Sequence, residues 1–500
     1  MIIKNFVLVL FLSATCFGYV LSDLNFDRNV DFYDLAIFSD QWLLAEDSNE
    51  PNSIGSGTAD YFVAASDSPD RVKIKADYVC DGIDDDVEIQ AAIDALPDFG
   101  GKVKLSAGRF NIGKPINFYR PDVPHWFSIC LEGQHIHSTR IFLQNGSNCN
   151  MIENVTTGVS PSGWEIIRDL KLDGNKKNNI SGNGYYSKRG SVNTGVSYDQ
   201  CIHNVFIYNV KERGIHIEDG WHISIFNCWI EQCDGDGLYL IGSESRLSSL
   251  QISSNKGRGI LLYGHDHNVY DFILRDLGED GFQTSALYNS TIANLSINDW
   301  GQVSSSQNAL YIDASSHHNT FSNISVKGTG TSSSSRGIAV YGDYNLLSNI
   351  TVEDTHCNPL YIAKGGDNNL ISNSYFKAGV SDNNSIIDDG ANNKIVGCTG
   401  LGNEELVTSG SPALKHWGVT KLNSAAGAIT AALPDGQYAG EIKTIVMTDA
   451  GNPSTVSATH HETSDPQVAI FDDVNEIWVL IWTGTRWATL KATCDFLSSQ

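Results

Sequence analysis

A short phrase that recurs about every two dozen residues constrains the fold of this chain more than any other feature. The phrase is typically Asn-[apolar]-x-[apolar], and it recurs at spacings of 21 to 29 residues, at Asn204, Asn227, Gln251, Phe272, Asn294, Asn323, Asn349 and Asn373. A second phrase, Gly-[apolar]-x-[apolar], alternates with it at Gly214, Gly237, Gly259, Gly281 and Gly337. Period-two alternation indicates strands, and Asn and Gly both tolerate left-handed backbone angles. Two short strands per repeat therefore predict an all-β coil whose equivalent side chains stack about 4.8 Å apart.

The segment before the repeats indicates export and calcium binding. Residues 1–22 combine Lys4, a short apolar run and small residues, which predicts a signal peptide and a secreted protein. Oxygen-bearing side chains then occupy positions 1, 3, 5, 9 and 12 of a loop, the spacing that surrounds Ca²⁺, as Asp23, Asn25, Asp27, Asp31 and Asp34. Segment 23–45 resembles one repeat of a dockerin, the module that attaches secreted carbohydrate-active enzymes to a scaffold protein, although Arg28 stands where glycine is usual. Residues 46–58 have linker composition.

A helix is predicted to close the first coil. Asp84 to Asp86 can cap it, and its apolar face is Val87, Ile89, Ala92, Ile93 and Leu96. With the strand that follows, this segment resembles the N-terminal cap of the pectate-lyase-like superfamily, which includes polysaccharide lyases, glycoside hydrolases and phage tailspikes. The resemblance implies a right-handed parallel β-helix over residues 59–410. The period then ends, and residues 411–500 are predicted to form a small accessory β-domain.

The outward columns of the glycine-led strands are the candidate binding groove. One column is predicted to hold His216, Tyr239, Leu261, Gln283, Tyr311 and Tyr361, and the next Glu218, Tyr263, Asp313 and Tyr341. Ionisable residues precede the glycines, namely Lys211, Arg213, Asp234, Asp236, Lys256, Arg258, Glu279 and Asp280. A long insertion nearby adds Lys188 and Arg189, and residues 165–215 carry eight basic and five acidic side chains. Sugar rings stack on aromatic faces and basic groups attract anions, so the mixture suits an anionic polysaccharide.

Two reactions fit this set of residues. In β-elimination, Lys211, Arg213, Arg258 or His216 serves as the base or neutralises a uronate, with Ca²⁺ held by Glu218, Asp234, Asp236 and Asp280. In hydrolysis, two of these carboxylates act as acid and base. The basic surplus and the superfamily resemblance favour the lyase by a small margin.

The remaining expectations concern partners. A net charge of −25 argues against a nucleic-acid ligand, and no apolar run is long enough to span a membrane. A monomer and a trimer both fit the sequence. The alternative to an enzyme is a non-catalytic, sugar-binding or tailspike-like fibre protein.

Overall fold

The computed structural model describes residues 60–120, 127–156, 164–188, 197–303, 306–328, 335–355, 358–378, 386–398, 404–436, 440–463 and 466–497. The predicted signal peptide, calcium loop and linker lie outside these ranges, as does Arg189. Secretion, calcium binding in the loop and the proposed domain boundaries therefore stay predictions.

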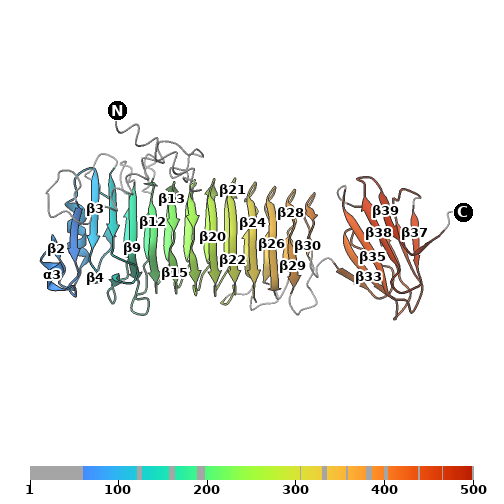
Figure 1. Ribbon diagram of the computed structural model, residues 1–500, viewed down its shortest axis with the longest axis horizontal. Helices are drawn as coiled ribbons and strands as arrows, with labels where there is room; N and C mark the ends of the chain where they lie inside the picture. Colours follow the sequence, from blue (N-terminus) through green and yellow to red (C-terminus); the bar gives the residue numbers. More distant parts are fainter. Residues whose placement is uncertain are drawn as a thin grey trace, which may run out of the picture. The chain divides into compact units, whose positions relative to one another are not determined.

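Most of the described chain winds into a right-handed parallel β-helix, which confirms the predicted fold class (Figure 1). The 12-stranded sheet contains β5 (Ile116–Asn117), β8 (Ile152–Val155), β10 (Tyr185–Lys188), β11 (Ser197–Tyr198), β13 (Ile215–Trp221), β16 (Leu238–Ser243), β19 (Ile260–His265), β21 (Phe282–Tyr288), β23 (Asn308–Ile312), β25 (Arg336–Val340), β27 (Leu360–Ile362) and β30 (Ile387–Asp388).

The 19-stranded sheet carries the remaining strands of the coils. These are β1 (Asp60–Ala64), β2 (Tyr78–Val79), β3 (Gly100–Leu105), β4 (Gly108–Ile112), β6 (Ser128–Glu132), β7 (Thr139–Leu143), β9 (Glu165–Asp173), β12 (Cys201–Tyr208), β14 (Ser224–Phe226), β15 (Trp229–Glu231), β17 (Arg246–Ser248), β18 (Gln251–Ser253), β20 (Asn268–Arg275), β22 (Thr291–Asn298), β24 (Thr320–Lys327), β26 (Leu346–Thr355), β28 (Leu370–Ser372), β29 (Tyr375–Ala378) and β31 (Lys394–Val396). Alternate side chains of both sheets point inward into one continuous apolar core.

A column of residues with left-handed backbone angles bends successive coils within the 19-stranded sheet. The predicted asparagines occupy this column, from Asn204 (φ +52°) to Asn373 (φ +50°). The prediction was wrong at two coils, where Ser249 (φ +53°) and Asp271 (φ +63°) hold the position instead of Gln251 and Phe272. Short polar side chains tolerate this backbone angle, so a search for asparagine alone misplaces the register there. At Asn227, Ser249 and Asn373 the bend divides the strand, so that a coil carries three strand segments, as in β16, β17 and β18; elsewhere one strand continues through the bend, as β20 does at Asp271.

The side chains of this column hydrogen-bond from coil to coil, and we call them the amide ladder. The amide Nδ2 of Asn294 donates to Oδ1 of Asp271 at 2.9 Å, and that of Asn323 donates to Oδ1 of Asn294 at 3.1 Å. The same pairing joins Asn349 to Asn323 at 3.3 Å and Asn227 to Asn204 at 3.4 Å. Hydrogen bonds between asparagine amides, and one from an amide to the Asp271 carboxyl group, thus hold the bends of successive coils in register.

The glycines of the second phrase lie where predicted but for a different reason. Gly214, Gly237, Gly259, Gly281 and Gly337 do not adopt a positive φ. A Cβ on Gly237 would lie 2.3 Å from Cγ2 of Ile252, and one on Gly259 would lie 2.5 Å from the carbonyl oxygen of Gly281. These positions require glycine because the backbone passes so close to core side chains and to the next coil.

Helix α4 (Asp86–Asp94) covers the first coil, and a short helix α3 (Asp70–Lys73) precedes it. Ile89, Ala92, Ile93 and Leu96 are buried as predicted, but Val87 is 58% exposed and does not belong to the apolar face. The Asp85 carboxylate accepts hydrogen bonds from the backbone N–H groups of Gly82 and Asn111 rather than capping the helix, so it ties the helix to the coil.

The last described segments form two smaller sheets, as expected of a small β-domain. One contains β32 (Glu404–Val407), β33 (Gly418–Asn423), β35 (Ile442–Asp449), β38 (Ile477–Trp482) and β39 (Trp487–Ala492); the other contains β34 (Thr430–Leu433), β36 (Ser454–Ala458), β37 (Gln467–Phe471) and β40 (Asp495–Phe496). They enclose an apolar core of their own that includes Trp478 and Trp487. Over the described ranges, no helix has both the length and the apolar character to cross a bilayer.

Candidate functional site

Four stacked tetrapeptides build a hollow of about 480 Å³ on the outside of the solenoid. They are Lys-Glu-Arg-Gly (211–214), Asp-Gly-Asp-Gly (234–237), Lys-Gly-Arg-Gly (256–259) and Gly-Glu-Asp-Gly (278–281), and each leads into a strand of the 12-stranded sheet. Backbone hydrogen bonds from Gly235 to Glu212, from Gly257 to Gly235 and from Glu279 to Gly257 fix their register. Gly235 and Gly257 leave the floor open between Glu212 and Glu279, while charged side chains form both walls.

The glycine at the centre of this floor has no room for a side chain. A Cβ on Gly257 would lie 2.6 Å from the carbonyl carbon of Gly235 and 2.8 Å from the backbone nitrogen of Asp236. The hollow therefore exists because the coils approach closely here with glycine on both.

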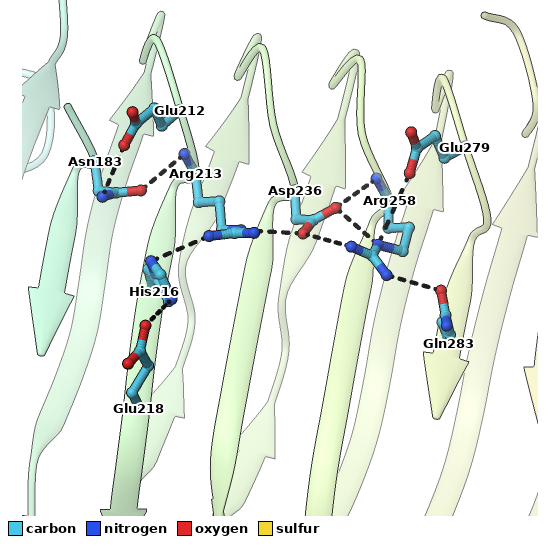
Figure 2. Close-up of polar contacts among 9 residues, drawn as sticks. All are labelled: Asn183, Glu212, Arg213, His216, Glu218, Asp236, Arg258, Glu279 and Gln283. Carbon is cyan, nitrogen blue, oxygen red and sulfur yellow. Dashed lines mark hydrogen bonds and ion pairs between the residues drawn. The ribbon is translucent and has the colours of Figure 1, made fainter. Parts of the chain in front are cut away.

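One wall is a column in which basic and acidic residues alternate from coil to coil (Figure 2). We call this column the charged ladder, and in coil order it contains Asn183, Arg213, Asp236, Arg258, Asp280, Asn308 and Arg336. Asp236, which is 4% exposed, accepts from Nε of Arg213 at 3.2 Å and from Nε of Arg258 at 3.0 Å. It also accepts from the backbone N–H of Arg258 at 2.9 Å. Asp236 is thus held between two guanidinium groups and cannot move without breaking the ladder.

The opposite wall surrounds one carboxylate with three ammonium groups. Asp234 receives Nζ of Lys211 at 2.9 Å, of Lys256 at 2.9 Å and of Lys176 at 3.2 Å. Burial by itself raises the pKa of the Asp234 carboxyl, but these hydrogen bonds outweigh it and hold the pKa well below the usual range. Three positive charges against one negative charge leave this wall electropositive.

His216 lies below Arg213 and is 8% exposed between Tyr186 and Tyr239 (Figure 2). Its Nε2 lies 3.1 Å from the Glu218 carboxylate, and its Nδ1 lies 3.3 Å from Nη1 of Arg213. Burial and the Arg213 charge lower the pKa of His216 to about 4, against the opposing effect of Glu218. The imidazole is therefore neutral at pH 7. It donates Nε2–H to Glu218 and accepts from Arg213 at Nδ1.

Asp280 belongs to the charged ladder but has a different environment from Asp236. Its carboxylate is 7% exposed and accepts from the backbone N–H of Asn308 at 2.5 Å. Burial raises the pKa of Asp280 to about 6, although the hydrogen bonds from Asn308 oppose this. The ladder therefore holds one carboxyl group that is hydrogen-bonded by two arginines and another whose pKa is raised to about 6.

The structure brings part of the predicted set together and places the rest farther along the same face. Register pairing puts His216, Tyr239, Leu261, Gln283 and Tyr311 in one column as predicted, with Ala339 between Tyr311 and Tyr361. Gln283 accepts from Nη1 of Arg258 at 2.9 Å, and Lys188 pairs with Glu218 at 2.9 Å. Tyr263 is 41% exposed on the neighbouring column. Asp313 accepts from the backbone N–H groups of Ala286 at 3.0 Å and Ser315 at 3.3 Å, so its carboxylate is engaged by the backbone.

Three further residues of this face had no role in the predicted site, although Lys176 and Glu212 were among the charged residues counted over 165–215. Glu212 lines the floor of the hollow, Lys176 contacts Asp234, and Arg336 ends the charged ladder. Arg336 carried a readable signal, because it precedes Gly337 just as Arg213 precedes Gly214 and Arg258 precedes Gly259.

The carboxylates proposed to hold Ca²⁺ in the groove do not fit a divalent cation as they stand. Asp234, Asp236 and Glu218 each contact at least one basic side chain. Within the described ranges, Cys80, Asp85 and Glu88 are the residues whose potential ligand atoms cluster closely enough for a metal, and they lie near the capping helix. Calcium therefore takes no part in the chemistry proposed for the hollow.

Comparison with known proteins gives one family match, which agrees with the fold, and several similar solved structures. The chain matches the family described as "Right handed beta helix region" over residues 131–273 and 200–343. The A-module of the mannuronan C-5 epimerase AlgE6 from Azotobacter vinelandii is similar to it, with 16% identity, 63% of this chain and 95% of that chain covered, and a TM-score of 0.49. DFA-IIIase from Arthrobacter chlorophenolicus has 10% identity, coverage of 67% and 93%, and a TM-score of 0.45. The enzymatically active domain of tailspike protein 2 of bacteriophage CBA120 is also similar, with 11% identity, 82% of this chain and 68% of that chain covered, and a TM-score of 0.39. No curated protein sequence matches the chain.

Proposed function

We propose that this chain, a member of the right-handed parallel β-helix superfamily, is a secreted enzyme that binds and cleaves an anionic polysaccharide at the hollow between residues 211 and 280. The observation that carries the proposal is the set of partly exposed basic side chains around an open glycine floor. Lys176, Lys211, Arg213, Lys256 and Arg258 supply five positive charges against the five carboxyl groups of Glu212, Asp234, Asp236, Glu279 and Asp280, a sum of zero on a chain whose net charge is −25. On so acidic a protein, a neutral patch whose cations are more exposed than their acidic partners favours an anionic ligand over the rest of the surface.

The partly exposed lysines and arginines suit the carboxylate of a uronate. Lys256 and Arg213 have side chains that are 61% and 33% exposed, whereas their partners Asp234 and Asp236 are 15% and 5% exposed. A carboxylate from solvent can thus approach the cations without displacing the buried aspartates. Tyr239, whose ring lies 4.3 Å from the Arg213 guanidinium, supplies an aromatic surface next to that position.

In the favoured reaction, β-elimination, the uronate carboxylate binds to Arg213. Neutralising Arg213 removes one cause of the low pKa of His216 and loosens the contact at its Nδ1. Nδ1 then takes the proton from the carbon next to the carboxylate, and the electron pair of that C–H bond forms the new carbon–carbon double bond. The glycosidic C–O bond breaks, and its oxygen leaves with a proton from water. Glu218 holds the imidazole ring through Nε2–H.

A second candidate, hydrolysis, is favoured by Asp280. Its pKa of about 6 suits a carboxyl group that donates a proton to a leaving oxygen. It stands two coils from Asp236, and coils stack about 4.8 Å apart, so the carboxyl groups are about 9–10 Å apart. That separation is near the upper end of the range typical of inverting glycosidases, about 6.5–9.5 Å. Asp236, however, is held by two arginines and is poorly placed to activate water.

The segment before the solenoid completes the proposal. We expect export through residues 1–22, Ca²⁺ binding by the loop from Asp23 to Asp34, and attachment to a scaffold protein through residues 23–45. An enzyme with these three properties works outside the cell.

The test is incubation of the full chain with long polygalacturonate, alginate and chondroitin sulfate, with dextran as the neutral control. Elimination predicts a rise in the ultraviolet absorbance of the conjugated double bond together with new reducing ends, and hydrolysis predicts reducing ends alone. His216→Gln is expected to abolish elimination, and His265→Gln, on the same sheet outside the hollow, is the matched control. Activity in neither assay would contradict an enzyme, and full activity of His216→Gln would remove His216 from the mechanism.

A further inference from the structure

The charged ladder ends in a second cationic position that has no acidic partner in the described part of the chain. Arg336 stands five coils along from Arg213, with Asp236, Arg258, Asp280 and Asn308 between them. At about 4.8 Å per coil, the two arginines are about 24 Å apart. Arg213 and Arg258 share Asp236, whereas among the described residues no carboxylate lies within ion-pair distance of Arg336.

Aromatic side chains hold this guanidinium in place. Its carbon Cζ lies 3.9 Å from the centre of the Tyr361 ring, and Nη1 donates to the Tyr341 hydroxyl at 3.2 Å. The same unit occurs in the hollow, where Arg213 lies 4.3 Å from the Tyr239 ring. In both places an arginine at the start of a strand of the 12-stranded sheet, or just before it, covers the outward tyrosine of the next coil. The arrangement leaves several N–H groups of Arg336 for an external acceptor.

Three tyrosines make a continuous aromatic surface beside Arg336. Tyr311 and Tyr361 lie in one column, separated by Ala339, which is fully buried. Tyr341, from the neighbouring column, packs 5.3 Å from Tyr311 and 5.9 Å from Tyr361 and so lies over the small alanine. All three tyrosine side chains are partly exposed. A planar cation next to exposed ring faces offers a sugar both a carboxylate partner and a stacking surface.

We propose that Arg336, with Tyr311, Tyr341 and Tyr361, is a second subsite for an acidic sugar unit, so that the protein acts on the interior of long chains. This rests on the proposed function, because it takes the same polymer to run along the outer face from the hollow. A long polyanion occupies both positions at once and gains from the second through effective concentration. A fragment too short to span five coils occupies only one of the two positions.

The experiment compares Arg336→Ala with Arg275→Ala, a matched loss of an exposed arginine on the other sheet. Binding of long polygalacturonate, alginate and chondroitin sulfate, and of short oligosaccharides of each, is measured by calorimetry on the full chain. For a polymer that the unaltered chain binds, Arg336→Ala is expected to weaken binding about tenfold, the effect of one charge-assisted contact, and to leave binding of the short fragments at the hollow unchanged. Arg275→Ala is expected to leave both unchanged.

Two outcomes overturn the inference in distinguishable ways. If the unaltered chain binds a long acidic polymer and Arg336→Ala binds it equally well, the second subsite is wrong and the hollow stands. If the unaltered chain binds none of the three polymers, the proposed function fails, and the subsite fails with it. Arg336→Gln, which keeps a planar polar head without the charge, replaces the alanine variant if that variant does not fold. Tyr361→Ala against Tyr361→Phe tests the aromatic surface in the same assay, with loss of binding expected only for alanine.

Discussion

The amide ladder and the charged ladder run along the same solenoid, yet different chemistry holds them. The amide ladder joins neutral side chains such as Asn294 and Asn323 across successive bends. In the charged ladder, Asp236 and Asp280 instead accept the backbone N–H of the next coil, and Arg258 stands between them. Both rows keep the coils in register. Only the charged ladder also borders a glycine floor, so only there does the alternation of charge face an open hollow.

The contrast between the two ladders indicates how a repeating fold acquires a binding site. A neutral ladder satisfies its own hydrogen bonds and offers little to a ligand. A ladder of alternating charges keeps the anionic members buried and leaves the longer cationic side chains reaching toward solvent. Stability and ligand binding therefore draw on the same residues in the charged ladder, and removing a buried carboxylate should have a large structural effect.

Asp236→Ala is expected to give the largest effect, a loss of about 2–4 kcal/mol in the free energy of unfolding. The substitution leaves two guanidinium groups and the backbone N–H of Arg258 without their shared acceptor. Because both arginines are partly exposed, the expected loss in the free energy of unfolding is smaller than for a fully buried ion pair. Asn294→Ala in the amide ladder is the matched variant. Its expected cost is about 1–2 kcal/mol, from the left-handed angle and two solvent-exposed hydrogen bonds. Urea unfolding measures both, and equal losses would contradict the distinction between the ladders.

The second prediction concerns pH, because Asp280 in the charged ladder and His216 beside it both have shifted pKa values. The pKa of Asp280 is about 6 when folded, above its ordinary value of 3.8. Between pH 4 and pH 6 the unfolded chain has released a proton that the folded chain keeps, so this group lowers stability as pH rises through that window. His216, with a folded pKa of about 4, has the opposite slope: stability is lost as pH falls from 6.5 to 4. The two contributions oppose each other in the unaltered chain.

Asp280→Asn separates them. At pH 7 the variant is expected to be more stable than the unaltered chain by up to about 3 kcal/mol, and the difference should vanish near pH 4. Asparagine still accepts the backbone N–H of Asn308, so the geometry is kept. Asp276→Asn, at an exposed position outside the strands, is the control for the loss of one carboxyl group. If the difference in stability between Asp280→Asn and the unaltered chain did not change with pH, the folded chain would not hold the Asp280 proton between pH 4 and pH 6.

The sequence predicted the coil and the outward column of His216, Tyr239, Gln283 and Tyr311, because period-two alternation and the repeated glycines set the register of the strands. It did not predict which carboxylates are enclosed by cations. Asp234 and Asp236 look alike in Asp-Gly-Asp-Gly, and their surroundings depend on Lys176, Lys211, Arg213 and the residues of the next coil. Such contacts arise only when residues about two dozen positions apart stack, and a column must be aligned correctly before they can be read. The misplaced Gln251 and Phe272 show how a one-residue or two-residue error loses that information.

Asp234→Asn is the smallest expected effect and tests the electropositive wall most directly. As an internal counter-ion, the Asp234 carboxylate competes with an external anion for the ammonium groups of Lys176, Lys211 and Lys256. Its neutralisation should tighten binding of an acidic polymer a few-fold, about 1 kcal/mol, and the gain should shrink as salt is added. Calorimetry at two salt concentrations measures this, and Asn294→Ala is the control for a ladder position away from the hollow. If Asp234 instead bound Ca²⁺ or took part in the reaction, the variant would bind more weakly or lose activity. The direction of the change therefore separates a counter-ion from a catalytic or metal-binding carboxylate.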